Sequence, residues 1–345
     1  MRAYRLIGAG RAELVELPRP EPGRGEVLLR VLAAGVCRTD LALLRSGGDG
    51  LVLPVTLGHE IVGEVVALGE GVTGGAGPHH GAVVAVYELL GCGRCAWCAR
   101  GHDNVCRELV PGAIGITRDG GMADHVVAPA RNLVALGGVD PVQAAPLTDA
   151  GMTALHAVER ARPLLEPGAT AVVIGIGGLG HLAVQFLRAT SKVRVLAVDV
   201  DRARLDFGAQ IGADDGVLTG PDAADGIVAA NAGRKVDVVF DFVGAQQSLD
   251  LAAAVTGRGG AIVVTGGGGG RLSITAQMGA GGAPDREIAI VHTFGGSRDD
   301  LLRALAIAEA GRVRTHVEVF ELTAASRVLA DLETGKVLGR AVLVA

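Results

Sequence analysis

The spacing of hydrophobic and polar positions changes near residue 150 of the chain. Before it, short apolar runs of β-type composition, such as 26–37 and 82–87, are separated by Gly and Pro. After it, apolar runs typical of buried strands alternate with segments of helical spacing, which predicts a parallel, doubly wound α/β sheet. The expected strands are 171–177, 193–199, 236–244 and 261–267, and the expected helices are 151–162, 179–190, 203–213 and 248–257. The tail predicts one more helix at 299–311 and a last strand at 340–345.

Length, composition and charge narrow the class of protein. A chain of 345 residues with 49% hydrophobic residues favours two domains with sizeable cores. The formal charge is −5 and no basic block occurs, which argues against nucleic acid or an anionic membrane as the main partner. The longest apolar stretch, 171–187, is shorter than the roughly 20 residues of a membrane span and contains glycines. Because the N-terminus lacks an apolar signal core, we expect a cytoplasmic protein.

A glycine-rich turn lies between the expected strand at 171–177 and the helix that follows it. The turn has the GxGxxG spacing of dinucleotide-binding loops and consists of Gly175, Ile176, Gly177, Gly178, Leu179 and Gly180. Glycine there permits a tight turn and close approach of the backbone to a pyrophosphate, which the helix N-terminus attracts. Asp199, which ends the next strand, would accept hydrogen bonds from the adenosine ribose and favours NAD over NADP. Arg202 and Arg204 lie nearby and could instead help a 2′-phosphate, and a purely structural glycine turn is the alternative.

Four of the five cysteines lie in the loop 91–106 with the spacing Cys-x2-Cys-x2-Cys-x7-Cys; they are Cys92, Cys95, Cys98 and Cys106. In a reducing compartment, clustered cysteines favour a metal site over disulfides. Four thiolates complete a tetrahedral zinc shell, so a zinc held here would be structural. The alternatives are a redox-active cysteine pair, an iron–sulfur cluster and a zinc ribbon that binds nucleic acid. The acidic charge of the chain argues against the ribbon.

A second metal site could be formed by Cys37, His59 and Asp149. These residues would supply one sulfur, one nitrogen and one oxygen, and a zinc with three protein ligands keeps a position for substrate or water. Each residue also has a structural explanation. Cys37 could be a small buried apolar residue, His59 a hydrogen-bonded core residue and Asp149 a helix N-cap. Their spacing along the chain does not decide between a metal site and these structural roles.

Segments spread over nearly the whole chain match one known family. They are GVCRTD at 35–40, GHEIVGEV at 58–65, the four-cysteine loop, DAGMTALHA at 149–157, GIGGLG at 175–180, FDFVG at 240–244, FGG at 294–296 and GRAVL at 339–343. The chain resembles the zinc-dependent medium-chain alcohol dehydrogenases. Among them it looks most like the bacterial NAD-dependent secondary alcohol dehydrogenases, or aryl-ketone reductases.

This resemblance implies an architecture and an activity. A β-rich, GroES-like catalytic domain would comprise 1–150 and 292–345, with an NAD-binding Rossmann domain at 151–291 inserted between them. The implied reaction interconverts secondary or aryl alcohols with ketones or aldehydes by hydride transfer to and from NAD. It would need two zincs per chain and a homo-oligomer, either a dimer or a tetramer. The alternatives are a polyol or amino-acid dehydrogenase of the same superfamily and a non-catalytic nucleotide-binding protein.

The resemblance also implies roles for individual residues. The three residues of the second metal site would bind a catalytic zinc, and Glu60 is a carboxylate that can approach it. Asp40 would accept a hydrogen bond from His59 and fix its tautomer, while Thr39 would take the proton of the alcohol. The implied cofactor contacts outside the glycine-rich turn are Arg38 and Arg340 at the pyrophosphate and Val243, Thr265 and Phe294 around the nicotinamide.

Three positions depart from the family pattern. Asp149 stands where most relatives have cysteine, and a carboxylate donates less charge than a thiolate, so we expect a more Lewis acidic zinc. Ala42 stands where some relatives have a histidine that ends the proton relay. Residues 81–84 read Gly-Ala-Val-Val in place of the familiar Gly-Asp-Arg-Val.

Overall fold

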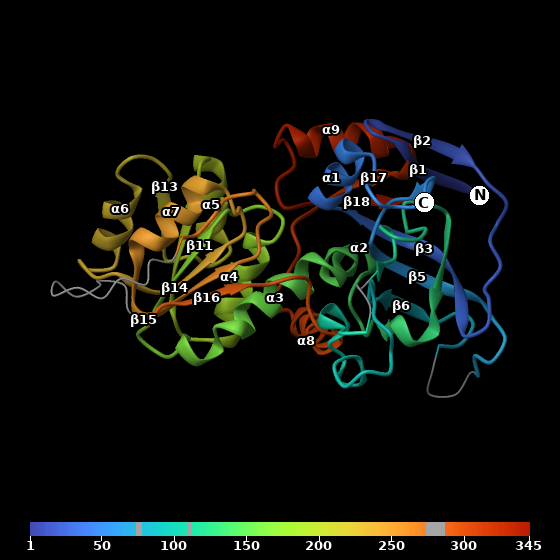
Figure 1. Ribbon diagram of the computed structural model, residues 1–345, viewed down its shortest axis with the longest axis horizontal. Helices are drawn as coiled ribbons and strands as arrows, with labels where there is room; N and C mark the ends of the chain where they lie inside the picture. The colour runs from blue at the N-terminus through green and yellow to red at the C-terminus, as the bar shows by residue number, and fades with distance from the viewer. Residues whose placement is uncertain (74–77, 109–111, 274–286) are drawn as a thin grey trace. The chain divides into compact units, whose positions relative to one another are not determined.

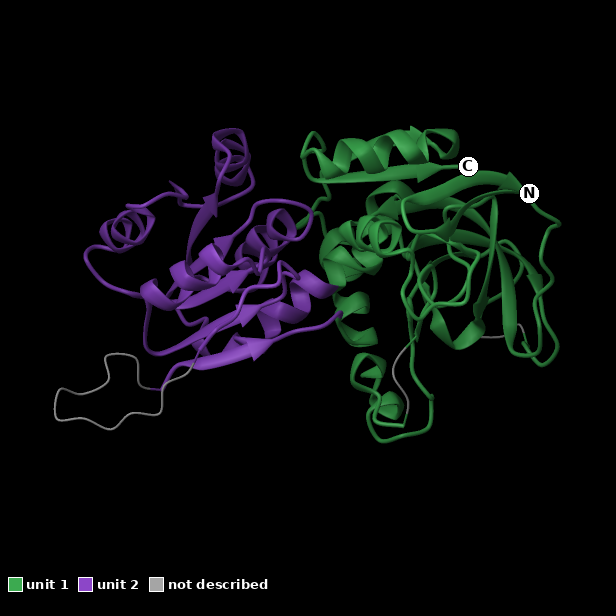
Figure 2. Ribbon diagram, turned by 45° about the horizontal axis from the view of Figure 1, so that its top comes forward, with its two compact units in different colours: residues 1–152, 296–345 green, residues 153–295 purple. Residues whose placement is uncertain are grey.

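The chain forms two compact units, which Figure 2 shows in different colours. Unit 1 comprises Met1–Met152 and Gly296–Ala345, and unit 2 comprises Thr153–Gly295. The computed structural model describes residues 1–73, 78–108, 112–273 and 287–345. None of the helices within these residues is both long enough and apolar enough to cross a membrane.

Unit 1 is built mainly from strands (Figure 1). Its strands are β1 Arg2–Gly8, β2 Arg11–Glu16, β3 Glu26–Val36, β4 Val55–Thr56, β5 Glu60–Leu68, β6 Val83–Val86, β7 Leu89–Leu90, β8 Gly112–Ala113, β9 His125–Pro129, β10 Leu133–Ala135, β17 Val317–Glu321 and β18 Arg340–Val344. The largest sheet has the order β10-β6-β5-β3-β18-β17, and β9 also pairs with β3. A second sheet has the order β2-β1-β4, and β7 pairs with β8. Because β18 pairs with β3 and β17 pairs with β18, strands from the last part of the chain join the sheet that β3 begins.

Unit 1 also contains α-helices. They are α1 Arg38–Ser46, α2 Pro141–Ala144, α8 Arg298–Glu309 and α9 Ala325–Glu333, while α3 Ala150–Arg160 crosses the boundary between the units. The start of α8 is a capping box, in which Ser297 Oγ accepts from the Asp300 N–H and Asp300 accepts from the Ser297 N–H. The core beside β3 is aliphatic and includes Val27, Leu29 and Val31 from that strand.

Unit 2 is a parallel sheet with helices, as the alternating pattern predicted. Its strands are β11 Thr170–Ile174, β12 Arg194–Asp199, β13 Asp215–Leu218, β14 Val236–Asp241, β15 Thr256–Val264 and β16 Ala289–His292. Its helices are α4 Gly180–Thr190, α5 Arg202–Gln210, α6 Ala223–Ala230 and α7 Gln246–Val255. The strand order is β13-β12-β11-β14-β15-β16, and every pairing is parallel. The order reverses between β11 and β14, which is where doubly wound sheets bind ligands.

Three elements of unit 2 were not expected from the sequence: β13, α6 and β16. Both strands lie at an edge of the sheet, and most of their residues are exposed or half-buried. An edge strand needs no continuous apolar run, so its sequence lacks the pattern on which the predictions were based.

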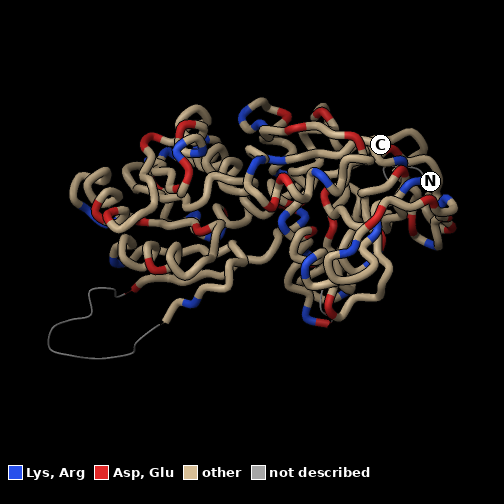
Figure 3. Tube along the Cα trace, turned by 90° about the horizontal axis from the view of Figure 1, so that it is seen from above, with Lys and Arg blue, Asp and Glu red and all other residues tan. Residues whose placement is uncertain are grey.

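Acidic and basic positions are interspersed along the traces of both units (Figure 3).

Candidate active site

A cluster of potential metal ligands lies in unit 1. Cys37 Sγ, a ring nitrogen of His59 and carboxylate oxygens of Glu60 and Asp149 all lie within 4.8 Å of one another. Cys37 joins β3 to α1, His59 and Glu60 lie at the start of β5, and Asp149 directly precedes α3. The fold therefore brings the three predicted ligands together from three separate segments of the chain.

The spacing of the donor atoms fits zinc. Cys37 Sγ lies 3.6 Å from Asp149 Oδ2, and His59 Nε2 lies 3.3 Å from the same oxygen. Sulfur at about 2.3 Å and nitrogen or oxygen at about 2.0 Å from a tetrahedral zinc are roughly 3.3 to 3.6 Å from each other. One sulfur, one nitrogen and one oxygen can thus hold a zinc and leave its fourth position to a substrate.

Asp40 lies behind two of these ligands. Its side chain is fully buried, and Oδ2 accepts a hydrogen bond of 2.8 Å from the Cys37 N–H. Oδ1 lies 3.6 Å from His59 Nδ1, so Nε2 is the nitrogen that faces Asp149. Burial lowers the pKa of His59, but the charges of Asp40 and Glu88 outweigh burial and hold that pKa well above its ordinary value.

Glu60 is a buried carboxyl group with an arginine partner. It forms an ion pair with Arg340, whose own exposure is 3%. Burial raises the pKa of Glu60 to about 7, against the opposing charge of Arg340. Gly35 of β3 pairs with Glu60 in the sheet, and a Cβ at Gly35 would overlap the carboxyl group. Position 35 therefore has to be glycine. Arg340 is paired with Glu60 in this structure, and its predicted contact with the pyrophosphate stays a prediction.

The first turn of α1 carries the other predicted residues of unit 1. Thr39 Oγ1 lies 3.7 Å from Cys37 Sγ, which places the predicted proton acceptor beside a metal ligand. Arg38 and Ala42 are exposed. A methyl group at position 42 cannot carry a proton onward, so the structure shows no side chain at this position that could continue a relay.

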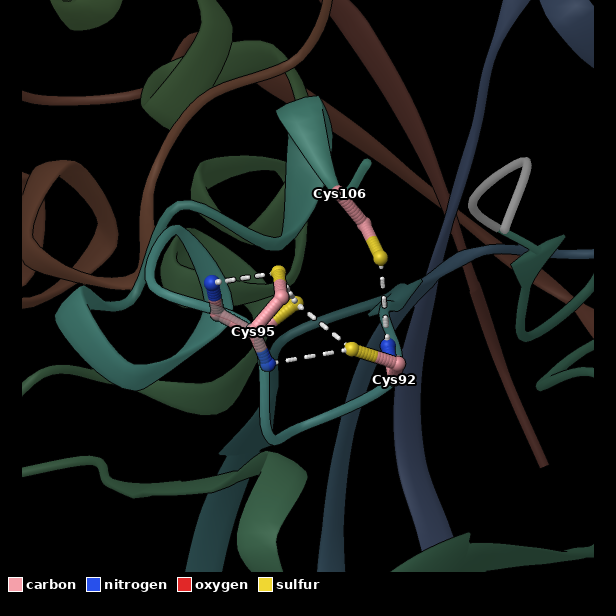
Figure 4. Close-up of side chains that lie close together, drawn as sticks. Cys92, Cys95 and Cys106 are labelled. Atoms are coloured by element: carbon pink, nitrogen blue, oxygen red, sulfur yellow. Dashed lines mark hydrogen bonds between the residues drawn. The ribbon is translucent and has the colours of Figure 1, made fainter. Parts of the chain in front are cut away.

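The four-cysteine loop also fits zinc. All four sulfurs lie within 4.8 Å of one another, and Figure 4 shows the sulfurs of Cys92, Cys95 and Cys106 close together. Cys98 Sγ is 3.9 Å from Cys92 Sγ and 3.6 Å from Cys95 Sγ, while sulfurs around a tetrahedral zinc are about 3.8 Å apart. Hydrogen bonds from the N–H groups of Cys98 and Arg107 lower the pKa of Cys95 to about 6, while burial raises the pKa of Cys98 to about 12, so Cys95 is the more acidic thiol of the two.

The glycine-rich turn of unit 2 has the conformation that its sequence predicted. Gly175 has a φ of +89°, and a Cβ at Gly180 would overlap the Gly175 carbonyl oxygen. Gly178 and Leu179 lead into α4. Gly175 and Gly180 exclude larger side chains, which leaves the N-terminus of α4 available to a phosphate.

The predicted ribose acceptor lies beside this turn. Asp199 Oδ2 accepts a hydrogen bond of 2.7 Å from the Ile176 N–H. A Cβ added to Gly177 would lie 3.1 Å from Arg204 Nη1, so that guanidinium group is also next to the turn. Both the acid that favours NAD and the arginine that could favour NADP are therefore close to the glycines.

The residues predicted to surround the nicotinamide follow consecutive strands of unit 2. Val243 follows β14, Thr265 follows β15 and Phe294 follows β16. Val243 and Phe294 are exposed, and Thr265 Oγ1 lies 2.8 Å from Thr293 Oγ1. The carboxyl ends of parallel strands are where such sheets bind ligands, which agrees with a cofactor site at this edge.

Comparison with known proteins assigns the chain to a family. Residues 23–138 match the family described as alcohol dehydrogenase GroES-like domain, and residues 178–310 match zinc-binding dehydrogenase. An NAD-dependent alcohol dehydrogenase of Sulfurisphaera tokodaii is 34% identical over 100% of both chains. The chain belongs to the zinc-binding alcohol dehydrogenase family.

Solved structures of other proteins agree with this assignment. The alcohol dehydrogenase of Aeropyrum pernix shares 33% identity with this dehydrogenase at a TM-score of 0.91, with 100% of both chains covered. The acetophenone reductase of Geotrichum candidum, solved in complex with NAD, shares 30% identity at a TM-score of 0.85. The alignment with the reductase covers 100% of this chain and 97% of the other.

One residue of this dehydrogenase was missed by the sequence analysis. Glu88 lies between β6 and β7, and its exposure is only 4%. Burial raises its pKa well above the ordinary value, and Asp149 acts in the same direction. No motif contains Glu88, and the only signal in the sequence was a charged residue directly after the apolar run 82–87.

Proposed function

We propose that this chain is an NAD-dependent alcohol dehydrogenase that interconverts secondary or aryl alcohols with ketones or aldehydes. The observation that carries the proposal is the donor set of Cys37, His59 and Asp149, whose distances fit a zinc with one open position. The NAD-dependent alcohol dehydrogenase of Sulfurisphaera tokodaii and the acetophenone reductase of Geotrichum candidum support it. The activity also requires a place for the phosphates of NAD, and the glycine-rich turn at the start of α4 provides one.

The residues around the metal position would act on the alcohol in distinct ways. Zinc held by Cys37, His59 and Asp149 supplies a Lewis acid that lowers the pKa of an alcohol hydroxyl, and NAD supplies the hydride acceptor. Asp40 keeps His59 and the Cys37 backbone in position. Thr39 Oγ1 would accept the hydroxyl proton of the substrate while it passes its own hydroxyl proton towards the nicotinamide ribose hydroxyl. Water would carry the proton from there to solvent, because Ala42 offers no group that can.

The activity is tested with a substrate panel. We expect the zinc-loaded protein to reduce NAD in the presence of 1-phenylethanol and to be less active with ethanol, sorbitol or threonine. Absorbance of NADH measures the rate, and each alcohol is tested with NAD and with NADP. Oxidation of threonine or sorbitol in preference to every simple alcohol would contradict the proposed substrate class. A protein that oxidises none of the four would contradict the activity itself.

Asp199 provides a test of the cofactor. We expect Asp199→Ala to lower kcat/KM for NAD about 10- to 100-fold, because hydrogen bonds to a charged group contribute about 1.5–3 kcal/mol. The value for NADP should change much less, since a carboxylate repels a 2′-phosphate. Asp201→Ala is the matched control, because this nearby acid caps α5 through the Ala203 N–H. Equal losses with both cofactors, or a wild-type preference for NADP, would show that Asp199 does not select NAD.

The proposal also covers the cellular compartment and the oligomeric state. We place the protein in the cytoplasm, where the five cysteines, none of which forms a disulfide, would remain reduced and available to metal. We also propose a homo-oligomer, a dimer or a tetramer, on the basis of family resemblance. Size-exclusion chromatography with light scattering measures this assembly directly.

A further inference from the structure

Asp149 lies at a break between two helical segments. The 3₁₀ helix η4 (Ala145–Thr148) ends directly before it, and α3 begins directly after it. The φ and ψ of Asp149 are −125° and −69°, which differ from the values of both kinds of helix. A regular helix therefore does not fix the backbone of this metal ligand, and its position depends on the residues on either side of it.

Thr148 connects one side of Asp149 to β5. Thr148 is fully buried, and its Oγ1 accepts a hydrogen bond of 3.1 Å from the Ile61 N–H. The same hydroxyl donates to the Ala145 carbonyl oxygen at 2.8 Å. A hydroxyl has one proton to donate and lone pairs with which to accept, so both bonds can form at once. Thr148 thereby joins the helix that leads into Asp149 to the strand that follows His59.

The residue on the other side of Asp149 is bonded to the same strand. The Ala150 N–H donates to Glu60 Oε1 at 3.4 Å. Residues 60 and 61 are the first two of β5 and directly follow the metal ligand His59. The segment 148–150 is thus held to the start of β5 at both of its ends. Between these two bonds, Asp149 Oδ2 lies 3.3 Å from His59 Nε2.

The Thr148 bond is the stronger of these two connections. It is shorter, at 3.1 Å against 3.4 Å, and N–H···O bonds weaken beyond about 3.2 Å. The carboxyl group of Glu60 is also shared with Arg340. Asp40 holds Cys37 and His59, the other two ligands. The hydroxyl of Thr148 is the corresponding contact for the third ligand.

We propose that Thr148 is a positioning residue, whose hydroxyl holds Asp149 at the zinc. This inference rests on the zinc site of the proposed function and makes no assumption about the substrate. Without Oγ1, the Ile61 N–H would lose this acceptor inside the protein, which is costly. The segment 148–150 would then shift, and the Asp149 carboxylate with it. Side chains that orient metal ligands commonly contribute about 10- to 100-fold to metal affinity.

The experiment measures zinc affinity by competition with a chelator, without NAD or alcohol. Thr148→Val keeps the shape of the side chain and removes the hydroxyl. We expect the dissociation constant of one zinc to rise at least about 10-fold, and that zinc should be the one missing from His59→Ala. Thr148→Ser keeps the hydroxyl and should stay within a few-fold of the wild type. Thr148→Ala should weaken zinc in the same way, and it provides the test if Thr148→Val does not fold.

Thr256→Val is the matched control. Thr256 is also fully buried, its hydroxyl donates to the Ala252 carbonyl oxygen, and it belongs to unit 2. We expect this variant to lower Tm and to leave zinc affinity unchanged. Cobalt in place of zinc gives a second measurement, because its visible absorption depends on the coordination geometry. The cobalt spectrum should change in Thr148→Val and remain that of the wild type in Thr148→Ser and Thr256→Val.

Two outcomes would overturn the role of Thr148. One is wild-type zinc affinity and an unchanged cobalt spectrum in Thr148→Val, even with a lower Tm. The other is an equal loss of zinc affinity in Thr148→Ser and Thr148→Val, which would assign the effect to packing. If the wild type binds zinc but oxidises no alcohol, the proposed function fails, and the zinc measurements still decide the role of Thr148.

Discussion

His59→Ala and Cys37→Ala are each expected to lower kcat/KM for 1-phenylethanol by at least about 10³-fold. Either change removes one of three ligands, and a zinc that acts as a Lewis acid contributes several kcal/mol to the transition state. Each ligand is buried, with an exposure of 1% for His59 and 5% for Cys37. Water cannot easily replace a ligand from inside the protein, so the metal should be lost as well as the activity.

Metal analysis separates loss of the ligand from general damage to the fold. We expect the zinc content to fall from two per chain to one in both variants, while the zinc of the cysteine loop remains. His80→Ala is the matched control, because His80 is exposed and is not part of either cluster. If His59→Ala or Cys37→Ala keeps activity within a few-fold of the wild type, this site is not the catalytic metal centre.

Cys95→Ser and Cys98→Ala should differ from His59→Ala and Cys37→Ala. We expect them to lower the stability of the protein and to change kcat/KM little. The loop 91–106 has few buried apolar side chains, and its buried residues are Cys98, Asp103 and Asn104. A loop of this kind depends on metal for its folded conformation. We expect the free energy of unfolding to fall by at least about 2 kcal/mol, which lowers Tm by about 4 °C or more.

The measurements are thermal unfolding, zinc content and kcat/KM at a temperature well below the new Tm. Zinc should again fall from two per chain to one, but kcat/KM should remain within a few-fold of the wild type. Cys37→Ala is the internal comparison, because it removes a cysteine and a zinc from the other site. A loop variant that loses activity while its Tm is unchanged would show that the loop has a role in the reaction.

Elements with a strong local pattern were predicted well. The strands and helices of unit 2 from β11 to β12 and from β14 to β15 lie within a few residues of the expected ranges. The strands among them are largely buried on both faces of a parallel sheet, which leaves continuous apolar runs in the sequence, and the helices show helical spacing. The edge strands β13 and β16 were not predicted, since their exposed faces need no such run.

The sequence by itself determined the groups whose members are close along the chain. The four cysteines occur within 91–106, and the glycines of the turn occur within 175–180. In both cases the backbone between the residues is too short to carry them far apart, so spacing alone indicates a shared site. The predicted chemistry at these positions therefore depended little on the rest of the fold.

Only the tertiary structure decided which distant residues share a site. Cys37 and Asp149 are 112 positions apart, and spacing left their roles open until the fold placed their donor atoms 3.6 Å apart. Glu88 gave only a weak signal, its place directly after an apolar run, because a glutamate is ordinary on a surface and unusual only where it is buried. Burial and partners are set by the packing of strands from remote parts of the chain, and local sequence does not contain that information.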